Sequence, residues 1–199
     1  LGLNDYFQNE GFSYRLVPIK SNSQGRIDKD ILYDNLMNKF RWGNMNDPNI
    51  VVDNTINRTT RIVRIRDNFR YLAILYAEEG DTVKAKALLA KCDELLPTSM
   101  YIPGLFDIDY AKAYYSIGEF EKGDNFLREI VKVTVQELDF FFSLNERQLK
   151  SCNQDVQYSL YTYQRIIQFA MSQERTDLYE EIIDNFAMYS DMFDKKIGR

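Results

Sequence analysis

The fold is decided by residues 69–97, which read FRYLAILYAEEGDTVKAKALLAKCDELLP. Before the glycine at position 80, apolar side chains recur every three or four residues, which is the spacing of one face of an α-helix. The glycine favours the end of that helix, and a second helix with small and apolar residues on one face stops before Pro97. The stretch therefore predicts two helices joined by a tight turn, with small residues where they cross.

The same arrangement recurs along the chain. Gly118 follows Gly80 by 38 residues, with aromatic and apolar residues at helical spacing on both sides. A third helix pair is expected at 156–172 and 176–193, with a turn near Glu174. The first pair is similar to the tetratricopeptide repeat, a helix-turn-helix unit with a period of about 34 residues. The positions that carry this similarity are Phe69, Leu72, Ala73, Tyr76, Gly80, Ala85, Leu89, Cys92 and Pro97.

These patterns predict an all-α fold of stacked helix-turn-helix pairs, about three in number, over residues 56–199. Residues 1–55 are expected to form an irregular segment that packs on the repeats and contains one short helix. The side chains expected in the core are Phe69, Leu72, Tyr76, Leu89, Tyr110 and Tyr114.

Within the N-terminal segment, residues 12–19 have the alternating pattern of a short extended stretch. Pro18 places this stretch at a sheet edge or outside any ladder, because proline lacks the backbone donor. A turn is expected at 21–25 and a helix at 29–40.

The composition excludes several classes of chemistry. The chain of 199 residues has no histidine and two cysteines, Cys92 and Cys152, which we interpret as thiols rather than a disulfide. This leaves no Ser-His-Asp or Cys-His nucleophile and too few strong ligands for zinc. The formal net charge of −5 disfavours nucleic acid as a partner, and no apolar stretch is long enough to span a bilayer. We therefore expect no catalytic residue, cofactor or metal in this chain.

Two groups of charged residues leave alternatives open. Asp107 and Asp109 form the Asp-x-Asp pattern with which some glycosyltransferases hold a metal, but a helix dipole alone favours acidic residues at the head of an expected helix. A basic run is formed by Arg58, Arg61, Arg64, Arg66 and Arg70. It is interpreted either as a phosphate or headgroup site or as arginine stems that flank a buried helix face. Helical geometry favours the second, since the arginines project to two flanks.

In a tetratricopeptide frame, the first helix of each pair lines a concave surface that can hold a peptide or a partner protein. The candidate residues of this groove are Arg70, Tyr71, Ile74, Lys112 and Tyr115. They mix aromatic, apolar and charged side chains, and other residues already supply the buried stripe. The alternative is plain packing of this face on another domain.

Three N-terminal strings carry a more specific resemblance: LGLNDYF at 1–7, EGFSYRLVPI at 10–19 and YDNLMNKFRWGNM at 33–45. They resemble the segment after the last membrane span in a family of bacterial multi-pass membrane proteins of unknown function. That family is related to the lipid-sugar-dependent protein O-mannosyltransferases of the GT-C type, and the resemblance extends over essentially the whole chain. It implies a soluble C-terminal domain at the periplasmic face of the inner membrane, attached to a membrane-embedded transferase core that holds the catalytic residues.

Two functions are therefore expected from the sequence. In the first, the chain is a non-catalytic interaction domain that positions an acceptor protein or a partner beside the membrane enzyme. In the second, it is a structural or oligomerisation domain that packs on the membrane core of its own parent chain or on a second copy. The chain begins at Leu1 without a signal segment, so we expect it to be a piece of a longer protein.

Overall fold

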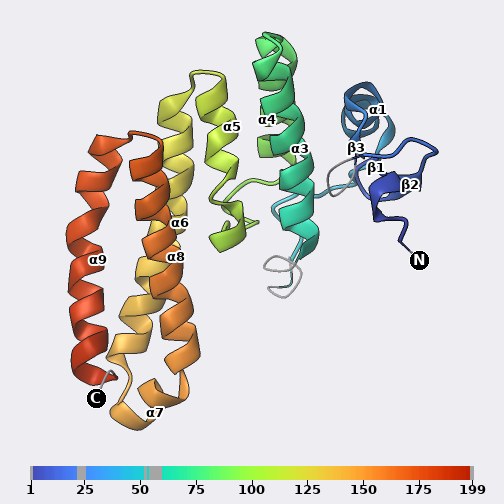
Figure 1. Ribbon diagram of the computed structural model, residues 1–199. Coiled ribbons are helices and arrows are strands. Elements are labelled where there is room, and N and C mark those ends of the chain that lie inside the picture. Colours follow the sequence, from blue (N-terminus) through green and yellow to red (C-terminus); the bar gives the residue numbers. More distant parts are fainter. Residues whose placement is uncertain (1, 22–25, 52, 54–59, 198–199) are drawn as a thin grey trace. The chain divides into compact units, whose positions relative to one another are not determined.

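The structure is a computed structural model that describes residues 2–21, 26–51, 53 and 60–197. The described residues are mostly helical, with one small sheet near the N-terminus (Figure 1). This confirms the expected all-α class with an irregular N-terminal segment. The turn expected at 21–25 and the helix start expected at residue 56 fall largely outside the described residues.

The helices are α1 (Lys29–Asp34), α3 (Thr60–Glu78), α4 (Thr82–Leu95), α5 (Tyr110–Ser116), α6 (Phe120–Ser143), α7 (Glu146–Ser151), α8 (Asn153–Ser172) and α9 (Thr176–Lys196). The strands are β1 (Phe7–Asn9), β2 (Tyr14–Leu16) and β3 (Arg26–Ile27). Two short 3-10 helices, η1 (Asn4–Tyr6) and η3 (Leu105–Asp107), and one π-helical turn, η2 (Asn35–Lys39), complete the described elements.

The chain forms two compact units. Unit 1 consists of residues 1–101 and 112–119, and unit 2 of residues 102–111 and 120–199. The N-terminal segment therefore shares a unit with α3 and α4.

The sheet of unit 1 has the strand order β2-β1-β3. β1 pairs antiparallel with β2, with Asn9 opposite Tyr14, and parallel with β3. The extended stretch expected at 12–19 is thus an edge strand, and it ends before Pro18. β1 and β3 were not expected, because strands of three and two residues are too short to show an alternating pattern.

Helices α3 and α4 form the expected helix-turn-helix pair (Figure 1). Gly80 joins them in a left-handed backbone conformation, with φ +86°. A residue with a Cβ atom adopts this conformation only at a cost in free energy. Asp81 then caps α4 by accepting a hydrogen bond from the backbone N–H of Lys84 at 3.1 Å. The core between the two helices contains the expected Phe69, Leu72, Tyr76 and Leu89.

The N-terminal segment packs on α3. The ring of Trp42 lies 5.7 Å from that of Phe69, and the ring of Tyr33 lies 5.6 Å from that of Tyr76 in an edge-on contact. Helix α1 begins at Lys29 with Asp28 as its N-cap, and the π-helical turn extends it to Lys39, close to the expected 29–40.

Helix α5 contributes to both units, and Gly118, with φ +77°, follows it at the expected turn. In unit 1, Tyr114 is buried and its hydroxyl donates to the carboxylate of Asp93 at 2.5 Å. In unit 2, Tyr110 is buried and its ring lies 5.1 Å from that of Phe126. The second pair is unequal, because α5 has 7 residues whereas α6 has 24.

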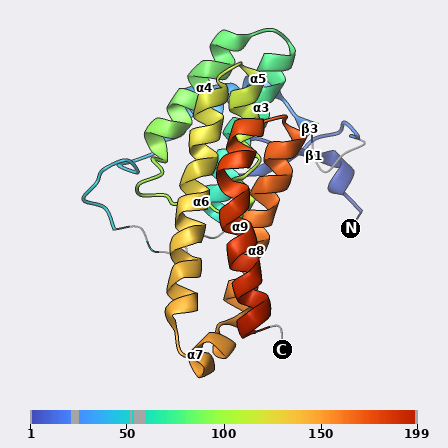
Figure 2. The same ribbon diagram turned by 90° about the vertical axis from the view of Figure 1, so that its left-hand side faces the viewer.

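In unit 2, α6, α8 and α9 lie side by side, and α7 connects α6 to α8 (Figures 1 and 2). The expected third pair is present, and it turns at Glu174, which has a φ of +55°. The hydroxyl of Tyr163 on α8 donates to the backbone carbonyl of Ile182 on α9 at 3.0 Å. Helix α7 was not expected, because it is short and buries only Leu149 among its side chains.

Candidate functional site

A pocket of about 640 Å³ lies between the β1–β2 hairpin and α3, entirely within unit 1. Three of its lining side chains are aromatic and exposed, two are isoleucines, and the rest are polar, apart from a glycine at the hairpin tip. The lining residues are Asn9, Gly11, Phe12, Tyr14, Ile62, Arg64, Ile65, Asp67, Asn68 and Tyr71.

Two asparagines clamp the hairpin onto α3. The amide of Asn9 donates to the side-chain oxygen of Asn68 at 2.8 Å, and the amide of Asn68 donates to the backbone carbonyl of Gly11 at 3.0 Å. The backbone N–H of Gly11 in turn donates to the side-chain oxygen of Asn9 at 2.8 Å. These bonds fix the position of the hairpin tip, so one wall of the pocket is held in place without a ligand.

Gly11 is required at the hairpin tip. Its φ is +105°, and a Cβ atom at this position would lie 2.6 Å from the ring of Phe40. A larger residue would therefore be strained in its backbone and would push the ring of Phe40 away.

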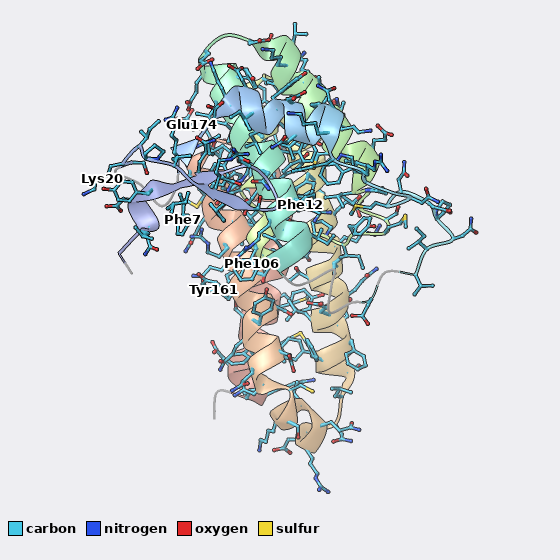
Figure 3. The ribbon with its side chains drawn as sticks, turned by 90° about the vertical axis from the view of Figure 1, so that its right-hand side faces the viewer. Phe7, Phe12, Lys20, Phe106, Tyr161 and Glu174 are labelled. Atoms are coloured by element: carbon cyan, nitrogen blue, oxygen red, sulfur yellow. The ribbon has the colours of Figure 1, made fainter. Side chains whose placement is uncertain are left out.

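The ring of Phe12, which follows Gly11, packs against two other aromatic rings. The centroid of Phe12 lies 4.7 Å from that of Phe40 and 5.5 Å from that of Trp42, yet 62% of Phe12 is exposed. Figure 3 shows Phe12 at the end of the hairpin that meets α3, while Phe7 and Lys20 lie at its other end. It is unusual for a large aromatic side chain to be held in place by its neighbours and yet remain exposed, and such a side chain indicates a contact surface.

On the opposite wall, Tyr71 is 47% exposed and is supported by Arg70. The guanidinium of Arg70 lies 4.0 Å from the centroid of the Tyr71 ring and donates two hydrogen bonds to Asp67, at 2.8 and 3.1 Å. Burial opposes the charge of Arg70, but the carboxylate of Asp67 outweighs this effect and raises the pKa of Arg70 above its usual value. The pocket thus has a fixed aromatic side chain on both walls.

Arg64 is the charged side chain of the pocket that is available to a ligand. It is exposed, and the part of the chain that the structure describes supplies neither a hydrogen bond nor an ion pair to it. Asn9, Asn68 and Asp67, by contrast, are already engaged within unit 1. The pocket can therefore offer apolar and aromatic contacts together with the positive charge of Arg64, which no residue in the described part of the chain pairs with.

The structure separates the five residues of the expected groove. Tyr71 lines the pocket and Arg70 supports it, whereas Ile74, Lys112 and Tyr115 are not among the lining residues. Lys112 is exposed and Ile74 is half-buried. Tyr115 is only 9% exposed, so the expectation that the core does not need it is wrong. The tetratricopeptide frame assigns a helix face to Tyr115 but does not say whether other residues cover that face.

The hairpin half of the site was not predicted from the sequence. Phe12 at the hairpin tip and Tyr14 and Leu16 on β2 alternate with polar residues in the sequence, and all three are more than half exposed. An alternating apolar pattern normally indicates a buried sheet face, so the alternation itself did not indicate exposure. Pro18 after this strand was the usable signal, because it indicates a sheet edge.

The other charged candidates have local structural roles. Asp107 is buried and accepts a hydrogen bond from the backbone N–H of Gly104 at 3.0 Å, which caps η3. Arg66 is also buried, and one of its guanidinium nitrogens donates to the backbone carbonyl of Tyr101. Arg64, Arg66 and Arg70 therefore do not form one basic patch, and this agrees with the helical geometry, which predicted that the arginines project to two flanks. The side chains of Arg58 and Arg61 lie outside the described residues.

Cys92 is a buried thiol and Cys152 a half-buried one. Within the described ranges, no three acidic, cysteine or histidine side chains are grouped so that they could hold a metal ion. None of the described helices is long and apolar enough to cross a membrane. Comparison with known protein families, with curated proteins and with solved structures finds no match.

Proposed function

We propose that this chain is a non-catalytic interaction domain that binds a segment of a partner protein at the pocket between the β1–β2 hairpin and α3. The observation that carries the proposal is the pair of exposed, supported aromatic side chains, Phe12 and Tyr71, on opposite walls of one pocket. Aromatic side chains with few rotatable bonds give a large contact area at a low cost in conformational entropy, which is why they are enriched at binding hot spots.

The resemblance of the N-terminal strings extends this proposal to a setting. In that setting the chain is the soluble part of a membrane protein related to GT-C glycosyltransferases, at the periplasmic face of a bacterial inner membrane. The bound segment would then belong to an acceptor protein that the domain positions for the membrane core, or to a partner of the enzyme. Phe12 and Tyr14 belong to the strings that carry the resemblance, and both line the pocket.

The second candidate function is structural: unit 2 packs on the parent membrane core or on another copy of the chain. Unit 2 exposes several large apolar side chains, among them Phe140, Tyr158, Tyr161 and Met171. A surface of this kind favours association. Sedimentation of the chain over a range of concentrations tests this function, since self-association through unit 2 would be weakened by Phe140→Asp.

The proposed peptide-binding function is tested with a phage library of random 12-residue peptides panned on the immobilised chain. Enriched peptides are then synthesised with a fluorophore, and their dissociation constants are measured by anisotropy. We expect Tyr71→Ala to weaken binding at least tenfold, because it removes one aromatic wall of the pocket. The matched control is Tyr158→Ala, since Tyr158 is also 47% exposed but lies on α8. Failure to enrich any peptide, or equal binding by both variants, would contradict the proposal.

A further inference from the structure

Among the described residues, no backbone group pairs with the outer edge of β2. The N–H of Glu10 donates to the carbonyl of Ser13, and the N–H of Val17 donates to the carbonyl of Tyr6. Because hydrogen-bonded and non-hydrogen-bonded pairs alternate in an antiparallel ladder, Tyr14 and Leu16 occupy the non-hydrogen-bonded positions. Their N–H and C=O groups therefore point away from β1.

Within the described residues, no strand pairs with this outer edge, because β2 is the end strand in the order β2-β1-β3. Tyr14 and Leu16 are also 54% and 55% exposed. An exposed edge with apolar side chains is a template for another strand, and natural proteins usually protect such edges with charge, proline or a covering segment. Here Pro18 lies beyond β2, and the charged residue within the strand, Arg15, pairs with Glu10 and lies on the sheet face opposite Tyr14 and Leu16.

The free edge and the pocket are continuous. Tyr14 lies opposite Asn9 in the ladder, and the side chains of both residues line the pocket. Side chains directly opposite one another on paired strands share a sheet face. A strand added along β2 would therefore direct every second side chain to the face on which the pocket lies.

The chemistry of the pocket favours a peptide over a sugar. An oligosaccharide is recognised mainly by polar side chains, but here the amides of Asn9 and Asn68 hold the hairpin against α3 and the carboxylate of Asp67 binds Arg70. A peptide strand instead bonds to the free backbone of β2, and only its side chains use the pocket. Arg64 then favours an acidic side chain or a terminal carboxylate beside the apolar one.

We propose that the partner segment binds as an added β-strand along the outer edge of β2. It places an apolar or aromatic side chain between Phe12, Tyr14 and Tyr71, and a carboxylate against Arg64. The inference rests on the proposed function and specifies how the segment binds and which chemistry it carries.

The test is an N-methyl scan of the tightest peptide recovered from the library. Each backbone N–H of the peptide is methylated in turn, and the dissociation constant is measured by anisotropy. An added strand turns alternate N–H groups toward β2, so we expect a loss of at least tenfold at every second position of the paired segment and little change between them. Losses without this alternation would overturn strand addition.

A protein variant tests the other side of the same bonds. Leu16→Pro removes an outward N–H, and proline is tolerated on edge strands at such positions. Its matched control is Leu16→Ala, which removes the side chain but keeps the N–H. We expect the proline variant to bind at least tenfold more weakly than the alanine variant, with unchanged circular dichroism, and Arg64→Gln to weaken acidic peptides selectively.

The outcomes separate this inference from the proposed function. If peptides bind in a Tyr71-dependent way but Leu16→Pro binds as well as Leu16→Ala, strand addition is wrong and the interaction function stands. If no peptide binds, both are wrong. If maltoheptaose binds and Tyr71→Ala abolishes that binding, the pocket is a carbohydrate site and the peptide occupant is refuted.

Discussion

At the scale of single residues, Asp124 on α6 and Arg175 before α9 form a largely buried ion pair in unit 2. The carboxylate of Asp124, whose side chain is 7% exposed, accepts two hydrogen bonds from the guanidinium of Arg175, at 3.1 and 2.6 Å. The guanidinium also lies 5.0 Å from the centroid of the Phe120 ring. The pair ties the start of α9 to α6 and is expected to matter for stability.

We predict that Asp124→Asn lowers the free energy of unfolding by about 3 kcal/mol, because it leaves a largely buried guanidinium without its counter-charge. The measurement is urea unfolding followed by circular dichroism. Glu146→Gln provides the control, since it breaks an exposed pair with Lys150 and should cost less than about 1 kcal/mol. Equal effects of the two substitutions would show that the buried pair has no special role.

Two buried tyrosines should make the free energy of unfolding depend on pH. Burial raises the pKa of Tyr163 to about 12, and burial together with Asp30 raises that of Tyr76 to about 12, from the ordinary value of 10.0. The folded chain therefore holds these phenolic protons more tightly than the unfolded chain does. The resulting stability is fully present below pH 10 and is lost as the pH rises through 12.

We predict that the free energy of unfolding falls between pH 10 and pH 12, and that Tyr163→Phe reduces this fall. Urea unfolding at several pH values measures both. Absorbance at 295 nm offers an independent check: if all 14 tyrosines of the folded chain ionise near pH 10, the prediction is wrong.

Helical spacing was sufficient to predict which residues are buried in the regular helices, including Phe69, Tyr76 and Leu89. It was not sufficient for Tyr115, because exposure of a helix face depends on segments elsewhere in the chain. Helical spacing also did not predict that Arg70 is buried. Its charge is tolerated there because of the ion pair with Asp67 and the contact with the Tyr71 ring.

At the scale of elements, each of the three helix turns has a left-handed residue, but glycine marks only two of them in the sequence, and the third was predicted from the layout of its two helices. Gly80 and Gly118 adopt the left-handed conformation without strain, whereas Glu174, an exposed residue, adopts a φ of +55° despite its Cβ atom. β1, β3 and α7 were not predictable from pattern, because their pairing and packing partners lie elsewhere in the sequence.

We predict that Glu174→Gly raises the free energy of unfolding by about 0.5 to 1 kcal/mol, since glycine relieves the left-handed strain but also gains entropy in the unfolded chain. Gly80→Ala should lower it by about 1 kcal/mol, for conformational reasons alone, because a Cβ atom there would contact nothing within 4 Å. Thermal unfolding of the two variants measures both changes. Destabilisation by Glu174→Gly would mean that the strain is absent.

The crossing of α3 and α4 gives a second prediction at this scale. Cys92 is 1% exposed and occupies a position where the repeat pattern predicts a small side chain. Cys92→Ala should cost at most about 1 to 2 kcal/mol, whereas Cys92→Phe should cost about 1 to 3 kcal/mol or more by overpacking. A phenylalanine variant as stable as the alanine variant would show that the crossing is loosely packed.

At the scale of the whole molecule, the sequence indicated an all-α chain with an irregular N-terminal segment, and the structure agrees. The sequence did not indicate that this segment would build half of a pocket. Asn9 and Asn68 are 59 residues apart and their contact has no periodic signature. The candidate site therefore depends on long-range contacts between the hairpin and α3, which pattern analysis of a single chain does not reveal.

The central claim is that the hairpin and α3 together bind a peptide, and the chain contains its own reporter for this event. Trp42 is the single tryptophan, and its ring lies 5.5 Å from that of Phe12. The most direct measurement is therefore a titration of a selected, tryptophan-free peptide followed by Trp42 fluorescence and, in parallel, by anisotropy. We predict a saturable change in Trp42 emission with the same dissociation constant as the anisotropy, and an increase of that constant by at least tenfold in Tyr71→Ala. Binding by anisotropy with unchanged Trp42 emission and no effect of Tyr71→Ala would place the peptide elsewhere and contradict the claim.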